Sequence, residues 1–235
     1  MTLHILATGT GRGIGAAIAA SFATDDVRFV GHSTTGGGAA LAADFSDPEA
    51  TIAFWWEAIS RLDGRIDVLI NNAGIFEATP IEQPDDAWRS AWERTMRINL
   101  TAAAELSRLA VLHFRERQGG RIINIASRAA YRGDSPDHWH YAASKAGMVA
   151  MTKSIARGYA HDNILAFAVC PGFTMTGMAE DYLASRGGEV LLADIPLGRV
   201  ADPAEVAATV RFLALEAPAS MTGAVLDING ASYVR

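Results

Sequence analysis

The sequence is poor in the features that mark several large classes of protein. Only one of its 235 residues, Cys170, is a cysteine, which excludes a disulfide framework and fits a reducing compartment such as the cytoplasm. The net charge of −6 and the lack of any basic cluster argue against a nucleic-acid-binding surface. No charged leader and no long apolar run is present, so we expect neither a signal peptide nor a membrane span.

Lysine is scarce as well. Lys145 and Lys153 are the only two among twenty basic residues. Lys145 follows Tyr141 by four residues in a helix-permissive run from about 140 to 160, so the ammonium and the phenol share one helix face. A cation nearby favours the phenolate and lowers the phenol pKa, which suits the group to proton transfer. Taken alone, however, such a pair more often marks a solvated tyrosine and a surface lysine.

A glycine-rich segment joins the first expected strand, residues 3–7, to the first expected helix, which begins near residue 16. Glycines at 9, 13 and 15 let the backbone approach an anion, and the helix N-terminus offers unpaired N–H groups. The common G-x-G-x-x-G spacing is absent because Ile14 stands in the place of its last glycine. A tight turn without a ligand is the alternative.

The second expected strand, Val27 to Gly31, lacks the acidic residue that commonly holds an adenosine ribose. The next carboxylate along the chain is Asp44, and Arg12 is available to pair with a 2′-phosphate. This favours NADP(H) over NAD(H). Only the short glycine-rich link 33–38 leads to the next strand candidate, Ala39–Phe45, whereas a parallel crossover usually needs a dozen residues. The crossover helix is therefore expected to be missing or reduced to a turn.

Strands alternate with helices along the whole chain, which predicts an α/β fold. We expect a doubly wound, Rossmann-type, largely parallel sheet with helices on both faces, forming one domain over residues 1–235. The segment of about 173–199 has weak periodicity and is expected to be a mobile substrate lid. Residues 9–15, 71–74, 127 and 171–172 all follow expected strands, so they should meet at the carboxyl edge of the sheet, where ligands bind.

These motifs together resemble the short-chain dehydrogenase/reductase family, in its short single-domain branch. The matches, in the family's order, are Thr8-Gly9-x-x-x-Gly13-x-Gly15, Asn71-Asn72-Ala73-Gly74, Asn99, Ser127, Tyr141-x-x-x-Lys145 and Pro171-Gly172 with Thr176. The tail 195–206 is similar to the 3-oxoacyl carrier-protein reductase group, whose substrate we do not carry over. The shortened link after the second strand and an alanine at 231 depart from the family pattern.

The resemblance implies an NAD(P)(H)-dependent oxidoreductase that interconverts a carbonyl and a secondary alcohol by hydride transfer. Tyr141 would be the general acid and base, and Ser127 would stabilise the developing alkoxide. Lys145 would hold the nicotinamide ribose and lower the tyrosine pKa. Asn99 would support a proton relay from Lys145 to solvent.

The resemblance also implies contact sets for the two ligands. The expected cofactor contacts are Gly9, Gly11, Arg12, Gly13, Ile14, Gly15, Ser33, Asp44, Phe45, Asn72, Ala73, Gly74, Tyr141, Lys145, Pro171, Gly172, Phe173, Thr174 and Thr176. The expected substrate contacts are Ser127, Ala129, His138, Trp139, Tyr141 and Phe173. A metal is not expected, because His138-x-His140 without a nearby carboxylate pattern is a thin ligand set.

Two other functions are compatible with parts of this sequence pattern. A non-catalytic dinucleotide-binding regulator or scaffold would use the same fold, but loss of Tyr141 or Lys145 would have favoured it and both are present. A sugar-nucleotide epimerase or dehydratase would need a further substrate domain, for which 235 residues leave little room. The expected partner is a small-molecule ketone or alcohol, and the family resemblance implies a homo-oligomer, tetramer or dimer, formed through the long helices at about 84–117 and 140–158.

Overall fold

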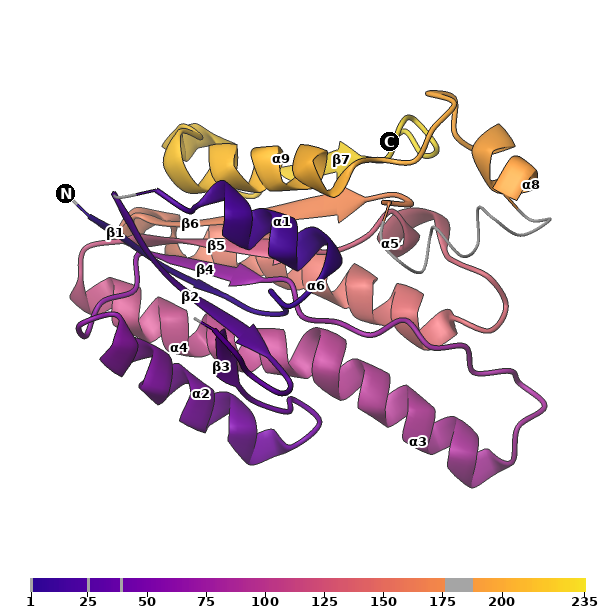
Figure 1. Cartoon of the computed structure of the whole chain (residues 1–235), viewed down its shortest axis with the longest axis horizontal. Helices are drawn as coiled ribbons and strands as arrows, with labels where there is room; N and C mark the ends of the chain where they lie inside the picture. The colour runs from indigo at the N-terminus through magenta and orange to yellow at the C-terminus, as the bar shows by residue number, and fades with distance from the viewer. Residues whose placement is uncertain (1, 25, 39, 176–187) are drawn as a thin grey trace.

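A computed structural model describes residues 2–24, 26–38, 40–175 and 188–235 of the chain. Within these ranges the centre of the fold is a parallel sheet of seven strands in the order β3-β2-β1-β4-β5-β6-β7 (Figure 1). The strands are β1 (Leu3–Ala7), β2 (Val27–Ser33), β3 (Ala40–Ala42), β4 (Val68–Asn71), β5 (Gly120–Ile125), β6 (Ile164–Pro171) and β7 (Val225–Ile228). The predicted doubly wound parallel sheet is confirmed.

Helices cover both faces of the sheet. They are α1 (Gly13–Ser21), α2 (Pro48–Arg61), α3 (Asp85–Met96), α4 (Ala102–Glu116), α5 (Ala129–Arg132), α6 (Trp139–Tyr159), α8 (Gly188–Ala193) and α9 (Pro203–Leu215). One core cluster joins α1 and α9 to the sheet, and another joins α2, α4 and α6 to the opposite face (Figure 1). Because both faces are covered, β4 and β6 are buried at every position and carry apolar runs without alternation.

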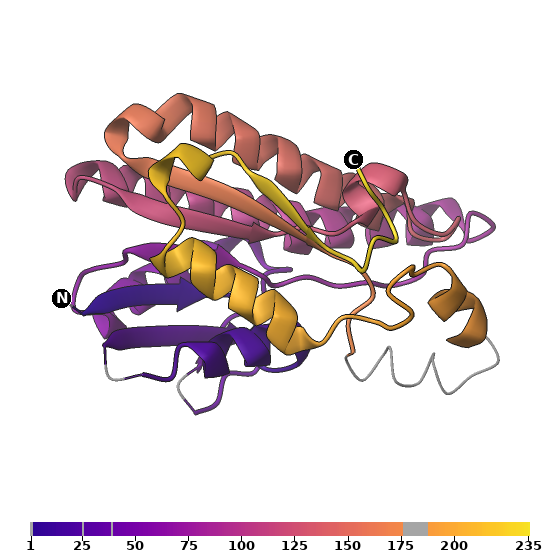
Figure 2. The ribbon, with the colours of Figure 1, turned by 90° about the horizontal axis from the view of Figure 1, so that it is seen from above.

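The position of β1 in the sheet decides where a ligand can bind. β1 pairs with β2 on one side and with β4 on the other, so the strand order reverses beside it. The turns that follow β1 and β4 are therefore neighbours at the carboxyl edge, which is where ligands lie in open α/β sheets. Figure 2 shows the strands running together from the N-terminal side of the molecule toward α8.

Two helices begin as local sequence rules require. The Asp47 side chain accepts a hydrogen bond from the Glu49 N–H at 3.0 Å, and Pro48 occupies the first helical position of α2. At α9 the Asp202 side chain accepts from the Ala204 N–H while Glu205 accepts from the Asp202 N–H, which forms a capping box. These caps fix the start of α9 at Pro203.

The long helical region expected from residue 84 is not one regular helix. A π-helical turn, η1 (Arg97–Thr101), separates α3 from α4 and places Asn99 fully inside the protein. Arg97 holds this turn in place: its guanidinium binds both Glu105 carboxylate oxygens at 2.7 and 2.6 Å and the Thr51 hydroxyl at 2.8 Å. Its Nε also donates to the Phe45 carbonyl at 3.1 Å, which links η1 to the segment after β3.

The link between β2 and β3 contains no described helix, as expected. Gly36, Gly37 and Gly38 adopt φ values of 70°, 120° and 58°, which L side chains rarely adopt, so the chain can reverse twice in a few residues. β3 ends at Ala42, short of the end of the strand expected over 39–45, because the chain turns away after Ala42 toward α2.

Two further expectations meet the structure only in part. The expected lid of about 173–199 includes α8, but residues 176–187 lie outside the described ranges, so the lid stays a prediction. None of the described helices is both long and apolar enough to cross a membrane.

Replacing Arg97 by Ala tests the anchoring of η1. The Glu105 carboxylate, the Thr51 hydroxyl and the Phe45 carbonyl would all lose a partner, so we expect the free energy of unfolding in urea to fall by about 2–3 kcal/mol. Arg89→Ala removes an exposed pair with Asp85 one helical turn away and should cost less than about 0.5 kcal/mol. Equal losses in the two variants would contradict a structural role for Arg97.

Candidate active site

The glycine-rich turn after β1 is built for close approach. Gly9 has a φ of 68°, and a Cβ at Gly15 would lie 1.8 Å from the Gly9 carbonyl oxygen, so the start of α1 packs directly on the turn. Arg12 caps α1 without a side-chain hydrogen bond, and the first turn carries no acidic residue. The N–H groups of that turn lack carbonyl partners within the helix, which leaves an anion-binding cradle of the kind a pyrophosphate needs.

A second set of contacts ties this turn to the one after β4. The Asn72 side chain donates to the carbonyls of Thr8 and Gly9 at 3.0 and 2.8 Å. The Thr8 hydroxyl accepts from the N–H groups of Asn72 and Ala73 at 3.0 and 2.9 Å. The two glycine-containing turns, 64 residues apart in the chain, therefore form one rigid wall.

Asn99 joins this wall to the interior. Its side chain accepts from the Ile75 N–H at 2.8 Å and donates to the Ile75 carbonyl at 2.9 Å. A Cβ at Gly74 would lie 3.3 Å from Asn99 Oδ1 and 3.5 Å from Lys145 Nζ, so a side chain at this position would crowd both groups. Asn72, Gly74, Asn99 and Lys145 are thus brought together as expected.

Lys145 lies on α6 with its side chain buried. Its ammonium donates to the Ile125 carbonyl at the end of β5 at 2.8 Å, and no carboxylate of the described residues forms an ion pair with it. Burial lowers the pKa of Lys145 to about 8. Two of its three N–H donors remain for a ligand, which fits the two hydroxyls of a ribose.

Tyr141 lies one helical turn before Lys145, whose Nζ is 5.8 Å from the centre of the tyrosine ring. Burial raises the pKa of Tyr141 to about 12, and a hydrogen bond with the Ser127 side chain lowers it only in part. The expectation that the phenol pKa lies below its usual value is therefore wrong for this arrangement, because the loss of hydration outweighs the hydrogen bond with Ser127. A phenol in this state keeps its proton at neutral pH and is ready to donate it.

Ser127 follows β5 directly and is buried. Its hydroxyl accepts from the Ala129 N–H at 3.1 Å, which leaves its own proton free to be donated. The Ser127 side chain is also a hydrogen-bond partner of Tyr141, so the two hydroxyls are neighbours. This is the arrangement expected of an oxyanion stabiliser beside a general acid.

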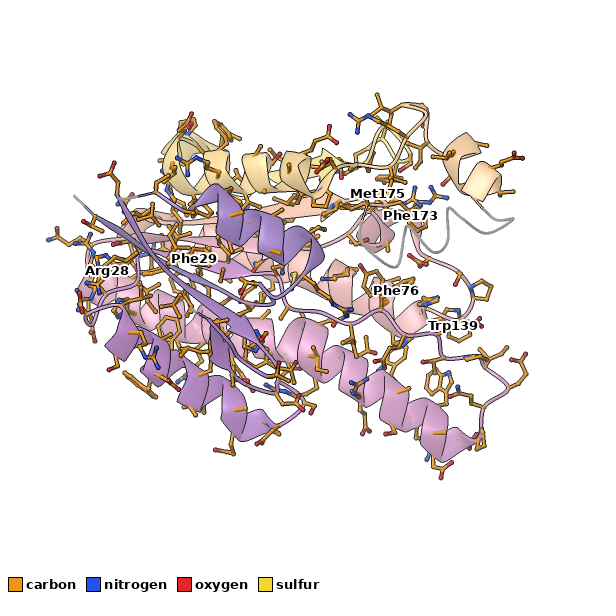
Figure 3. All side chains as sticks on the ribbon, in the orientation of Figure 1. Arg28, Phe29, Phe76, Trp139, Phe173 and Met175 are labelled. Atoms are coloured by element: carbon orange, nitrogen blue, oxygen red, sulfur yellow. The ribbon has the colours of Figure 1, made fainter. Side chains whose placement is uncertain are left out.

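One wall of the expected substrate pocket is aromatic. The Phe76 ring stacks on His138 with centroids 3.9 Å apart and meets Tyr141 edge-on at 4.8 Å. Figure 3 shows Phe76 and Phe173 near the start of α6. The Arg128 guanidinium lies 4.6 Å above the Phe173 ring and pairs with Asp194 at 3.2 Å, so it is no free surface arginine.

The other expected contacts are placed less centrally. Trp139 is 54% exposed and borders a surface groove with Ile81 and Trp88, and its role as a substrate contact stays a prediction. His138 and His140 have separate partners, Ser135 at 2.6 Å and Thr79 at 3.1 Å. No cluster of three potential metal ligands occurs in the described ranges.

Several of the expected cofactor contacts have side chains that are bound to other groups of the protein. The Phe45 ring is buried and stacked on His32, so an expected cofactor contact there would come from its backbone. The Ser33 hydroxyl donates to the Gly36 carbonyl inside the link, and Asp44 is exposed. Thr174 is buried with its hydroxyl on the Gly172 carbonyl at 3.2 Å, and Thr176 lies outside the described residues.

Sequence reasoning missed three residues that shape the site. Thr8 lay within a recognised motif, and its bonding role follows from a hydroxyl next to the turn. Arg97 gave no local signal, because its partners come from α2, α4 and the segment after β3. The sequence analysis assigns no role to His32, although a polar residue next to the end of the second expected strand indicates a side chain at the cofactor edge.

The chain is similar to known proteins over nearly its full length. The family described as enoyl-(acyl carrier protein) reductase matches residues 9–231. The 3-oxoacyl-(acyl-carrier-protein) reductase FabG of Vibrio cholerae is 34% identical over 97% of this chain and 96% of the relative, and that of Escherichia coli K12 is 33% identical over the same shares. An acetoacetyl-CoA reductase of Acinetobacter is 36% identical over 91% of this chain and 79% of the relative.

A solved structure agrees with this relationship. The crystal structure of gox2181 superposes with a TM-score of 0.89 at 25% identity, covering 98% of this chain and 95% of that one. The sequence and structural relatives therefore share the arrangement of the whole fold with this chain and not only one motif.

Gly15→Ala tests the cradle. A Cβ at this position collides with the Gly9 carbonyl, so we expect the variant to show no saturable binding of NADPH or NADH in a fluorescence titration. Gly158→Ala is the matched control, because this helical glycine has open space around it and lies in the last turn of α6. Normal dinucleotide binding by Gly15→Ala would show that the ligand does not use this turn.

Proposed function

The chain belongs to the short-chain dehydrogenase/reductase family, and from this premise we propose how its own residues perform the reaction. It is an NAD(P)(H)-dependent oxidoreductase that interconverts a carbonyl and a secondary alcohol by hydride transfer. A non-catalytic role finds no support, since the relatives are named as reductases. The proposal depends on one observation: the hydroxyls of Ser127 and Tyr141 share a hydrogen bond, one turn of α6 from the buried ammonium of Lys145.

In this proposal the nicotinamide supplies or accepts the hydride when it is bound. Tyr141 donates its phenolic proton to the carbonyl oxygen during reduction and takes a proton from the alcohol during oxidation. Ser127 donates a hydrogen bond to the same oxygen as negative charge develops there. Lys145 stabilises the tyrosinate that forms when the proton leaves, and holds the ribose.

Asn99 completes the proton path in the proposal. Its amide is fixed by the Ile75 peptide group and lies close to the Lys145 ammonium across Gly74. One lone pair of its Oδ1 remains available to orient a proton carrier between Lys145 and solvent. The rigid π turn would keep this geometry constant during turnover.

Tyr141→Phe tests the proton donor. We expect kcat for ketone reduction to fall by a factor of about 10³ or more while the Kd of NADPH stays within about twofold, because only the reacting proton is removed. Tyr131→Phe is the control, since that hydroxyl contacts Arg235 and not the site. The assay follows reduced nicotinamide absorbance over a panel of ketones and alcohols that includes acetoacetyl-CoA. Retained turnover in Tyr141→Phe would remove this mechanism.

Cofactor choice is proposed to favour NADP(H). Arg12 is exposed beside the cradle and makes no ion pair within the described ranges. No carboxylate follows β2 until Asp44, so nothing adjacent to the strand end repels a 2′-phosphate.

We expect NADPH to bind at least about tenfold more tightly than NADH, because one guanidinium–phosphate pair is worth that much. Arg12→Ala should abolish most of this difference by weakening NADPH alone. Arg28→Ala, at the opposite end of β2 (Figure 3), should leave both affinities unchanged. NADH binding tenfold more tightly than NADPH would overturn the assignment.

The assembly and location of the enzyme are also proposed. We propose a homo-oligomer, tetramer or dimer, that uses α4 and α6, where Leu112 is 46% exposed on α4. The buried thiol of Cys170 is consistent with the cytoplasm. Light scattering should give a multiple of 24.9 kDa, and a monomer mass at micromolar concentration would contradict the assembly.

A further inference from the structure

His32 makes two hydrogen bonds that determine its protonation state. Its ring lies at the end of β2 and is 4% exposed. Nδ1 lies 3.0 Å from the Gly9 nitrogen and must accept a hydrogen bond from its N–H. Nε2 lies 2.9 Å from the Ala43 carbonyl oxygen and must donate a hydrogen bond to it. Only a neutral imidazole with its hydrogen on Nε2 satisfies both partners.

These two bonds join the parts of the protein that surround the adenosine half of the expected cofactor. Gly9 belongs to the glycine-rich turn, and Ala43 follows β3 after the shortened link. The backbone of His32 is bound to the same turn: its carbonyl accepts from the Thr10 N–H at 2.7 Å, and its N–H donates to the Thr10 hydroxyl at 3.0 Å. Where a crossover helix is missing, an imidazole connects the segment after β3 to the glycine-rich turn.

Packing prevents the ring from turning away. It stacks on Phe45 with centroids 4.2 Å apart and 7° between the planes, and it meets the Phe54 ring of α2 edge-on at 5.1 Å. A protonated ring would therefore present an Nδ1–H directly to the Gly9 N–H, two donors facing each other in a buried place. On protonation, the ring would either lose its hydrogen bond with the Gly9 N–H or move out of its stack with Phe45.

We propose that neutral His32 is a positioning residue for the dinucleotide, whose Nδ1 lone pair holds the Gly9 peptide in the orientation that the cradle requires, so that protonating the ring weakens cofactor binding. This inference rests on the proposed function. It adds to that function a dependence of cofactor affinity on acid pH.

The surroundings determine the pH range. Burial lowers the pKa of His32 below its usual 6.5, while the Ala43 carbonyl and the Asp44 carboxylate oppose this shift. The other charged groups nearby are Arg94, which acts on Asp44, and Arg97, which binds the Phe45 carbonyl. The neutral, binding form therefore persists above pH 6.5, and affinity should be lost as the pH falls below that value.

The experiment measures the Kd of NADH by fluorescence from about pH 8 to about pH 5. NADH is used first because a 2′-phosphate itself titrates near pH 6 and would confuse an NADPH curve. NADPH is then titrated on the same proteins, since the difference between variants cancels the titration of the phosphate. For the natural protein we expect the Kd to rise by about tenfold at the acid end, the effect of losing one buried hydrogen bond.

Two variants distinguish the effect of losing the Nδ1 acceptor from the effect of protonating the ring. His32→Asn keeps an acceptor near the Nδ1 position but cannot gain a proton, so its NADH affinity at pH 7.5 should lie within about threefold of the natural protein and stay flat to acid pH. His32→Leu keeps the packing but loses the acceptor, so its Kd should be raised about tenfold at every pH.

His113→Gln is the matched control. His113 is likewise held neutral by burial, and its Nε2 accepts the Ile66 N–H at 3.1 Å, but that bond lies before β4 at the opposite edge of the sheet. This variant should lose NADH affinity at acid pH as the natural protein does, even if its thermal unfolding temperature changes.

The outcomes are distinct. An unchanged acid loss in His32→Asn, or normal affinity in a folded His32→Leu, would overturn the role of His32. A natural protein whose NADH affinity is constant over the whole range would overturn it as well. Failure of the natural protein to bind either dinucleotide at pH 7.5 would instead refute the proposed function.

Discussion

The burial of the Lys145 ammonium, which has no carboxylate partner in the part of the chain that the structure describes, is the constraint on which the active site depends. A lone cation in a protein interior is costly and needs donors and acceptors arranged around it. The Ile125 carbonyl at the end of β5 supplies one acceptor, and Gly74 places no side chain against the ammonium. The positive charge therefore remains available to ligand atoms. It also lies near the Tyr141 ring, where it would stabilise the phenolate once the proton has left.

The two halves of the cofactor edge are joined through one short turn. The Gly9 peptide is held at its N–H by His32 and at its carbonyl by Asn72, and Asn72 belongs to the turn that leads to Gly74 and Lys145. Arg97 adds a second connection, from the Phe45 carbonyl beside His32 to the π turn that carries Asn99. A continuous set of hydrogen bonds therefore links the two ends of the expected cofactor site.

Several elements could be predicted because their causes are local. The starts of α2 and α9 are predictable from a few neighbouring residues, namely Asp47 with Pro48 and Asp202 with Glu205. The apolar run of β6 predicts a strand that is buried on both faces of the sheet. In contrast, β3 ends before the predicted residue 45 and η1 interrupts the helix predicted from residue 84, because Arg97 binds partners that are distant in the chain, including the Phe45 carbonyl after β3.

The sequence by itself determined the fold class, the missing crossover helix and the spacing of Tyr141 and Lys145, since periodicity, capping and helix geometry act over a few residues. Only the tertiary structure decided the protonation of the site. The raised pKa of Tyr141, the lowered pKa of Lys145 and the neutral state of His32 all follow from removal of water by segments far apart in the chain. Solvation depends on the complete packing around a group, which no local stretch of sequence specifies.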